Sequence, residues 1–413
     1  MHIFLTYIQI SYVGGKYMRK KFVSILMSTV LCLTLLAGCG DSEADTKEAE
    51  NKVDASKIKI GAIYVGDENE GYTAAHMEGI KEMAKEYGLS DDQIIEKTCI
   101  KEDESCYDAA IDLADQGCNI IFANSFGHED YILRAAAEYK DVTFCHATGY
   151  QAASSGLENM HNYFDSIYEA RYVSGVVAGL KLKEMIDNGK ITKEQAKIGY
   201  VGAFPYAEVI SGYTAFYLGV KSIVSDVTME VQYTNSWADS TLEGETASAL
   251  IADGCVLISQ HADTTGAPAV CEAKGIPVVG YNVDMSSVAP NTTLTSPTNN
   301  WGVYYKYAVG CLLDGTKIDT DWCKGYADDA VGTTVLGKAC ASGTKEEVKK
   351  VVAALKDGSL HVFDTSKFTV ENKQVTTWKN KAGIEYIKDG YFHESEGISA
   401  PAFELKIDGI ESK

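Results

Sequence analysis

Aromatic, amide and carboxylate side chains recur where the short apolar runs of this sequence end. Tyr72 follows the first run, Asn124-Ser125-Phe126 follow the second, and His146 to Tyr150 follow the third. The second half repeats the pattern at Phe204-Pro205, Asn235-Ser236-Trp237, Gln260-His261-Ala262-Asp263 and Gly280-Tyr281-Asn282-Val283-Asp284. Aromatic rings offer π faces, and amide and carboxyl groups offer hydrogen-bond donors and acceptors. A single aromatic residue here could be core, but so many predict a site that sandwiches a flat heterocycle.

Sequence patterns of known catalytic sites are missing from the chain. It contains no G-x-x-x-x-G-K-[ST], no G-x-S-x-G and no H-E-x-x-H. Gly127-His128-Glu129-Asp130 could be a metal or acid/base cluster, but acidic residues are also typical of a helix N-terminus, which we favour. The sequence therefore predicts a binding protein that has no catalytic residues, metal or cofactor.

The candidate binding residues follow segments that alternate between strand and helix. Apolar runs predict strands at 59–66, 120–123 and 142–145, and periodic patterns predict helices at 71–89 and 130–139. Strands that alternate with helices predict a parallel sheet with right-handed crossovers. The sequence therefore predicts an α/β protein.

The same order of elements occurs a second time. Residues 197–202 resemble the first strand, and Gly212-Tyr213-Thr214-Ala215 resembles Gly71-Tyr72-Thr73-Ala74 at the start of the helix that follows. Residues 249–255 resemble 112–118, and a further strand is predicted at 276–280. The alternative is chance similarity between α/β segments, but three matches in one order favour a duplication. Two such lobes would place their strand ends along a shared cleft, where open α/β sheets bind ligands.

Composition limits the possible partners and the disulfide content. The net charge of −21 disfavours nucleic acid and anionic lipid as partners. Nine cysteines lie between Cys99 and Cys340, an odd number that cannot all pair internally, and no C-x-x-C occurs. We expect mostly free thiols, with Cys118 and Cys255 buried at the starts of equivalent strands.

The N-terminus reads as a secretory signal with a lipid attachment site. Arg19-Lys20-Lys21 precede a short apolar run that ends in Leu36-Ala37-Gly38-Cys39, a lipobox in which Cys39 takes the lipid. The alternative, a membrane-spanning helix, needs about 20 apolar residues, which the run lacks. We expect a signal peptide at 1–38, with a true start at Met18, and a flexible tether at 39–56.

Several segments of the sequence resemble segments of the basic membrane protein family, also called PnrA-like lipoproteins. These are substrate-binding proteins of ABC transporters. The resemblance runs from about Lys57 to about Gly315 and is carried by 71–79, 168–172, 260–263, 280–285 and 301–305. It implies a type I periplasmic-binding fold, in which two doubly wound α/β lobes close over a ligand about a hinge of three crossings. It also implies a monomer on the outer face of the cell membrane, held by its lipid, with ABC permease subunits as partners.

The resemblance further implies lobe boundaries and a ligand. Lobe 1 would comprise 57–168 and 285–318, and lobe 2 would comprise 169–284 and 319–413. Characterised relatives are taken to bind purine nucleosides, and some bind free purine bases. The expected function is thus binding of a purine nucleoside or base for an ABC importer.

Site residues are carried over by position. Tyr72 and Phe126 would stack on the base opposite Trp237, and Asp284 would accept hydrogen bonds from ribose hydroxyls or a base N–H. The polar edge would be completed by Asn235, His261 and Asp263. The remaining expected ligand-binding residues are His76, Asn124, Ser125, Tyr150, Glu169, Phe204 and Trp301. Tyr72 stands where the family has Trp, and the acidic segment 67–70 departs from the family and reads as a solvated loop.

Two other function classes share these features. A receptor lipoprotein with the same fold would pass its bound state to a membrane sensor. A lipid-anchored nucleoside hydrolase would use His261, Asp263 or Asp284 for chemistry. A structural adhesin is the least consistent with a polar, aromatic cleft.

Overall fold

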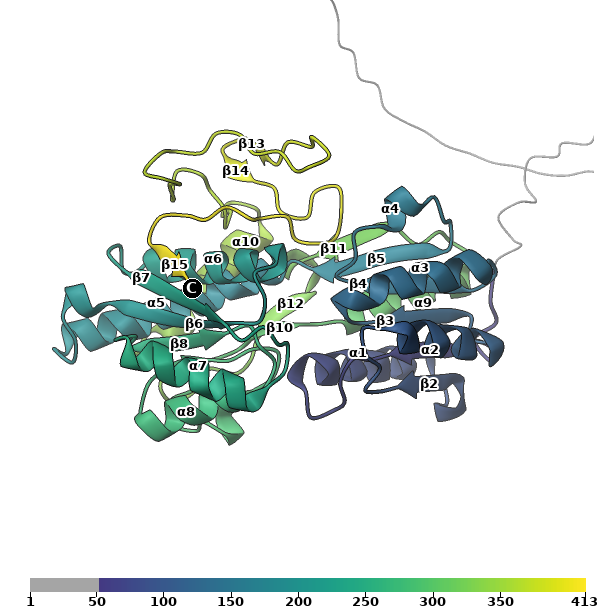
Figure 1. Ribbon diagram of the computed structural model, residues 1–413, viewed down its shortest axis with the longest axis horizontal. Coiled ribbons are helices and arrows are strands. Elements are labelled where there is room, and N and C mark those ends of the chain that lie inside the picture. Colours follow the sequence, from purple (N-terminus) through teal and green to yellow (C-terminus); the bar gives the residue numbers. More distant parts are fainter. Residues whose placement is uncertain (1–51) are drawn as a thin grey trace, which may run out of the picture. The chain divides into compact units, whose positions relative to one another are not determined.

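Residues 52–413 are described by a computed structural model, in which two parallel sheets are each packed between helices (Figure 1). The predicted signal peptide, Cys39 and most of the predicted tether lie outside this range. From residue 52 onward, no helix is both long enough and apolar enough to cross a bilayer. The α/β class predicted from the alternation of strands and helices is confirmed.

The first sheet has the strand order β11-β5-β4-β3-β1-β2, with every neighbouring pair parallel. Its strands are β1 (Ile60–Ile63), β2 (Ile94–Lys97), β3 (Ile120–Ala123), β4 (Thr143–Ala147), β5 (Met160–Asp165) and β11 (Asp321–Lys324). Helices α1 (Gly71–Tyr87) and α9 (Gly302–Asp314) pack together on one face, while α2 (Glu104–Asp115) and α3 (Glu129–Glu138) cover the other. Side chains alternate between the two faces along each strand, so Ile60 and Ile63 enter different cores.

The second sheet has the order β15-β7-β6-β8-β9 and is also parallel. Its strands are β6 (Lys197–Gly202), β7 (Thr228–Tyr233), β8 (Leu257–Gln260), β9 (Val278–Val279) and β15 (Ile410–Ser412). Helices α5 (Ile167–Asp187) and α6 (Ala207–Lys221) pack together on one face, and α7 (Ser240–Ala252) and α8 (Gly266–Lys274) on the other. Both lobes are therefore doubly wound.

The two lobes share a strand order. The run β2-β1-β3-β4 of the first sheet has the same connectivity as β7-β6-β8-β9 of the second, as expected of a duplication. Cys118 and Cys255 are buried just before β3 and β8, at equivalent places. One predicted match fails in detail, because Gly212 to Ala215 lie inside α6, which begins at Ala207, and not at its start. Tyr213 is therefore a core residue.

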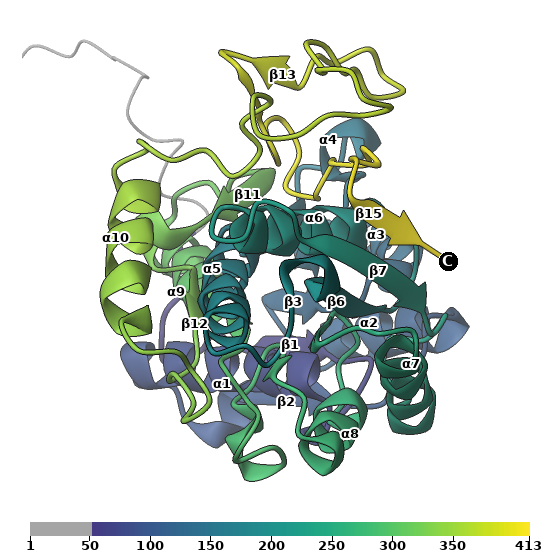
Figure 2. The ribbon, with the colours of Figure 1, turned by 90° about the vertical axis from the view of Figure 1, so that its left-hand side faces the viewer.

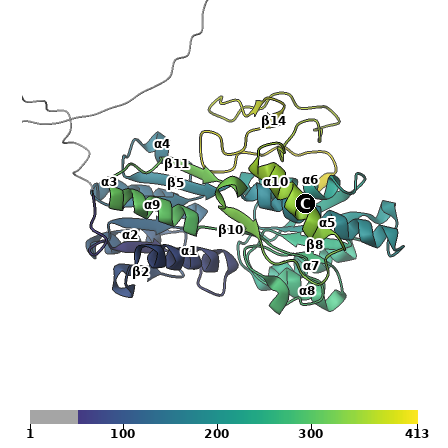
Figure 3. The same cartoon turned by 180° about the vertical axis from the view of Figure 1, so that it is seen from behind.

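Three crossings join the lobes, and they shift the expected lobe boundaries. The chain leaves lobe 1 between β5 and α5, returns through β10 (Pro297–Asn299), and leaves again through β12 (Val331–Thr333). Strands β10 and β12 pair antiparallel and contact α5, and Figure 3 shows β10 between the lobes. Because β11 pairs with β5, lobe 1 extends past residue 318, where the sequence placed its end.

The chain after β12 returns to the second lobe. Helix α10 (Thr344–Lys356) packs on α5, and β15 adds the last strand beside β7. Between them a segment with the hairpin β13 (Ile387–Lys388) and β14 (Tyr391–Phe392) lies over α6 and α10 (Figure 2). Its aromatic residues extend the main core: Phe363 stacks on Phe403, with ring centroids 4.3 Å apart, and on Tyr168 of α5 at 5.3 Å. Helix α4 (Ala152–Ser155) is a single turn before β5.

The contact between α5 and α6 depends on two glycines. A Cβ on Gly175 would overlap the carbonyl oxygen of Phe216, and a Cβ on Gly219 would overlap that of Tyr172. These helices therefore approach backbone to backbone, and any larger side chain would separate them.

We predict that Gly175→Ala lowers the free energy of unfolding by about 1 to 3 kcal/mol, because overlap outweighs the better helix propensity of alanine. Gly244→Ala, in the middle of α7, is the matched control, since the nearest atom to its Cβ would be 3.4 Å away. That variant should be neutral or stabilised by up to about 1 kcal/mol. Urea unfolding of both measures the difference, and equal effects would contradict the packing argument.

Candidate functional site

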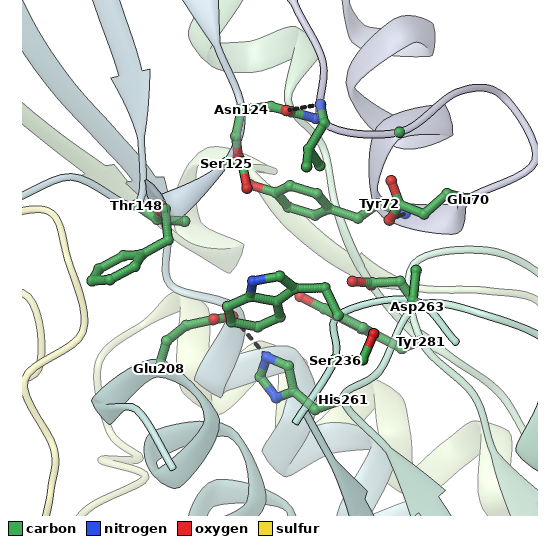
Figure 4. A pocket seen from close by; sticks show the side chains of 15 residues that line it. Glu70, Tyr72, Asn124, Ser125, Thr148, Glu208, Ser236, His261, Asp263 and Tyr281 are labelled. Carbon is green, nitrogen blue, oxygen red and sulfur yellow. Dashed lines mark hydrogen bonds and ion pairs between the residues drawn. The ribbon is translucent and has the colours of Figure 1, made fainter. Parts of the chain in front are cut away.

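A cavity of about 290 Å³ lies where strand ends of the two lobes face each other (Figure 4). Lobe 1 lines it with residues that follow β1, β3 and β4, and lobe 2 with residues that follow β6, β7, β8 and β9. The lining residues are Val65, Gly66, Glu70, Tyr72, Asn124, Ser125, Phe126, Thr148, Glu208, Ser236, Trp237, Ala238, His261, Asp263 and Tyr281. The shared cleft at the strand ends is thus present.

Helix α1 starts at the edge of this cavity and fixes the ring of Tyr72. The carboxylate of Glu70 caps the helix by accepting hydrogen bonds from the backbone N–H of Tyr72 (3.1 Å) and Thr73 (3.0 Å). The hydroxyl of Tyr72 donates to the backbone oxygen of Asn124 at 2.7 Å. Asn124 is itself held in place, because its Oδ1 accepts from Val65 N at 3.0 Å. Tyr72 is therefore anchored both at its backbone N–H and at its hydroxyl.

Two predicted site residues support Tyr72 from behind. His76 meets the Tyr72 ring edge-on at 4.5 Å and stacks on Trp301 at 4.2 Å. His76 Nδ1 is 2.5 Å from the hydroxyl of Tyr305. His76 and Trp301 are fully buried and do not line the cavity, so they hold the ring in place and do not face a ligand.

Lobe 2 supplies a second aromatic face. Trp237 lies after β7 and packs against Phe204, with ring centroids 5.0 Å apart. Phe204 also stacks on Tyr206 at 5.2 Å, and Tyr206 stacks on Phe126 of lobe 1 at 5.3 Å. An aromatic chain therefore crosses from one lobe to the other beside the cavity.

A hydrogen-bonded network around Glu208 and His261 forms the floor of the cavity on the lobe 2 side. His261 Nε2 is 2.7 Å from Glu208 Oε1, and His261 Nδ1 is 3.3 Å from the hydroxyl of Tyr200. Burial opposes ionisation of Glu208, but His261 and Arg171 together hold its pKa below the ordinary value. Burial also lowers the pKa of His261. The pair is therefore a carboxylate with a neutral imidazole that donates from Nε2.

Arg171 connects the hinge helix α5 to this floor. Its Nη1 donates to the backbone oxygen of Gln260 at 2.7 Å, and its guanidinium lies 3.7 Å from the ring centroid of Tyr281. The side chain is fully buried. Arg171 thus positions Tyr281 by a cation–π contact and does not itself line the cavity.

Asp263 lies at the junction of the lobes. It is 7% exposed, and its Oδ1 accepts from Asn282 Nδ2 at 2.9 Å. Its backbone oxygen accepts from the N–H of Gly71, across the cleft, at 3.2 Å. Burial raises the pKa of Asp263 well above the ordinary value, and the nearby Glu70 raises it further. Figure 4 shows both carboxyl groups at one end of the cavity.

Half of the site residues expected from the sequence meet at the cavity, and half do not. Those that line it are Tyr72, Asn124, Ser125, Phe126, Trp237, His261 and Asp263. Those that do not are His76, Tyr150, Glu169, Phe204, Asn235, Asp284 and Trp301. Three of the second group, His76, Phe204 and Trp301, touch lining residues from behind.

The other four residues lie elsewhere for identifiable reasons. Asp284 is exposed and caps a helical turn, accepting from Ser286 N at 2.8 Å, so its carboxylate is used outside the cavity. Glu169, at the hinge, accepts from Tyr326 N at 2.7 Å and lines a separate cavity. Asn235 has a φ of 55° and is exposed. Tyr150 is half exposed beyond Phe126.

Several lining residues were not expected from the sequence. Glu70 belongs to the segment that read as a solvated loop, and its position just before a helix was the signal for a cap. Tyr281 lies in a segment that follows a predicted strand but was not expected to contact a ligand, and Glu208 was not expected either. Within residues 52–413, no group of three or more His, Cys, Asp or Glu could hold a metal ion.

Residues 57–359 match the family described as ABC transporter substrate-binding protein, PnrA-like. A purine-binding protein of Brucella abortus is 34% identical over 86% of this chain and 94% of its own. A putative ABC transporter glucose-binding protein of Haloferax volcanii is 27% identical over 85% of this chain and 86% of its own.

A solved structure shows the same fold. The solute-binding protein of an ABC transporter system from Conexibacter woesei superposes with a TM-score of 0.60 at 19% identity, over 74% of this chain and 98% of its own. The two doubly wound lobes with three crossings thus form a type I periplasmic-binding fold. The chain belongs to the PnrA-like family of ABC transporter substrate-binding proteins.

Proposed function

We propose that this protein binds a purine base or purine nucleoside between its lobes and delivers it to the permease of an ABC importer. The observation that carries the proposal is that Tyr72 of one lobe and Trp237 of the other line a single cavity. Flat faces from opposite lobes suit a flat ring that is gripped when the lobes close. The Brucella abortus relative, described as purine-binding, supports the same ligand class.

A sugar is the rival ligand class, because one relative is described as a putative glucose-binding protein. A sugar stacks on aromatic rings but also needs hydrogen-bond partners all around its rim. In lobe 1, Asn124 and Ser125 already bond to protein groups, with Ser125 Oγ donating to Glu102 at 2.7 Å. The polar groups that remain available to a ligand are thus mainly in lobe 2. This arrangement favours a ligand ring with one polar edge.

Binding without chemistry is part of the proposal. In a hydrolase His261 would have to exchange a proton with the ligand or with water. Both of its ring nitrogens are within hydrogen-bond distance of Glu208 and Tyr200. These contacts favour a fixed structural imidazole over a proton-transfer group.

We also propose that Cys39 carries the lipid that holds the protein at the outer face of the membrane. The lipobox Leu36-Ala37-Gly38-Cys39 supports this attachment. We predict that Cys39→Ala abolishes incorporation of labelled palmitate in growing cells and releases the protein from the membrane fraction. Retention of both label and membrane association in the variant would contradict the anchor.

A ligand screen tests the proposed function. We predict that one or more of adenine, hypoxanthine, guanine and their nucleosides raises the melting temperature of the protein, freed first of co-purified ligand. A ligand at 100 times its Kd stabilises by about 2.7 kcal/mol, which a thermal-shift assay detects. Pyrimidines are the negative control. A shift with glucose and none with any purine would replace the purine assignment with a sugar.

The stacking model predicts the effect of two substitutions. Tyr72→Ala and Trp237→Ala should each raise the Kd of the best purine about tenfold or more, because each removes one face of the sandwich. Tyr150→Ala is the matched control, since that ring is half exposed and does not line the cavity, and its Kd should change less than about twofold. Isothermal titration measures all three, and unchanged affinity in both cavity variants would remove the stacking model.

A further inference from the structure

The polar atoms of the cavity are unequally used. On the lobe 1 side, the Tyr72 hydroxyl, Asn124 Oδ1 and Ser125 Oγ all bond to other protein groups. On the lobe 2 side, Glu208 uses Oε1 for His261, and Asp263 uses Oδ1 for Asn282. Among residues 52–413, Glu208 Oε2 and Asp263 Oδ2 have no hydrogen-bond partner, so these two oxygens remain for a ligand.

The two free oxygens differ in their electrostatic surroundings. The negative charge of Glu208 is stabilised by Arg171 and by the hydrogen bond from His261 Nε2. Glu70 and Glu208 line the same cavity as Asp263, and Glu243 accepts from the adjacent Thr264 N. These three carboxyl groups oppose ionisation of Asp263, and Arg171 of α5 favours it. Burial, together with three neighbouring carboxyl groups against one guanidinium, disfavours ionisation of Asp263.

Glu243 and Glu70 are each fixed in place by hydrogen bonds of their own. Glu243 is fully buried, its two oxygens accept from Thr264 N at 3.2 Å, and burial raises its pKa to about 7. Glu70 is fixed by the two N–H groups that it caps, so it cannot swing away from Asp263. The hydrogen bond from Gly71 N to Asp263 O keeps the two segments together. Asp263 is therefore the carboxyl group of the cavity with the least compensation.

We propose, on the basis of the purine-binding function above, that Asp263 meets the ligand as a neutral carboxylic acid. Its hydroxyl group donates a hydrogen bond to a ring nitrogen or carbonyl oxygen of the purine, while Glu208 accepts from an N–H on another part of the ring. Asp263 thus requires an acceptor on the ligand, which makes it a specificity-determining residue. The ionised form would repel such an acceptor.

Closure of the lobes is then coupled to uptake of a proton by Asp263. Glu70 belongs to lobe 1 and Asp263 to lobe 2, so only the closed arrangement places them at one end of the cavity. In the open protein Asp263 is solvated and ionised at neutral pH, and it takes up a proton on closure. The pKa of Asp263 is higher in the bound, closed state than in the open state. The affinity for the purine is therefore greatest at a pH below the pKa of Asp263 in the open form. It falls as pH rises toward the raised pKa of the closed form, by up to about tenfold per pH unit.

Calorimetry measures this proton directly. Titration of the best purine from the screen, in two buffers of equal pH but different ionisation enthalpy, gives the number of protons taken up. We expect uptake approaching one proton near neutral pH for the wild-type protein. Asp263→Asn keeps a donor and an acceptor, so it should bind with a Kd within about tenfold of wild type and take up almost no proton.

Two further variants complete the test. Glu70→Gln removes the neighbouring charge and should reduce the uptake, which keeps the proposal testable if Asp263→Asn fails to fold. Asp284→Asn, exposed and outside the cavity, should leave both affinity and uptake unchanged. Tight purine binding with no proton uptake, or uptake that persists in Asp263→Asn, would overturn the role of Asp263 and leave the purine function standing. A lack of purine binding by the wild type would overturn the function itself.

Discussion

The start of helix α1 is the place where the two lobes and the cavity depend on the same few hydrogen bonds. Glu70 satisfies the N–H groups of Tyr72 and Thr73, and Gly71 donates across the cleft to the backbone oxygen of Asp263. A buried N–H without a partner costs about 1 to 3 kcal/mol, so the helix start is held where these acceptors lie. The ring of Tyr72 follows from that position, and so does the contact between the lobes.

The sequence predicted individual strands well where an apolar run is buried on both faces of a sheet. Strands β3 and β6 have the predicted bounds, because a run of apolar residues between polar turns leaves little choice. It did not predict β2, β5, β7, β11 or β15. The last two are sheet-edge strands in which few side chains are buried, as in β11, where only Trp322 is. Their pairing depends on segments far away in the chain, which a local pattern does not reveal.

The candidate site shows a similar division. Residue types at strand ends located the cavity, because parallel strands bring their ends together wherever the fold is doubly wound. They did not indicate which way each side chain turns. After β9 the chain takes a left-handed conformation at Asn282, with a φ of 60°, and Asn282 contacts Asp263 while Asp284 points outward. An acidic segment usually faces water, so the sequence did not predict that Glu70 caps a helix that borders the cavity.

The central claim is that a purine lies between Tyr72 and Trp237, and a crystal structure of the mature protein with a bound purine tests it most directly. We expect the planar ring between these two side chains, with one edge toward Asp263 and Glu208 and with both lobes contacting the ligand. Density for the purine at any other place, such as the cavity beside Glu169, or a non-planar sugar ring in the cavity between the lobes, would contradict the account.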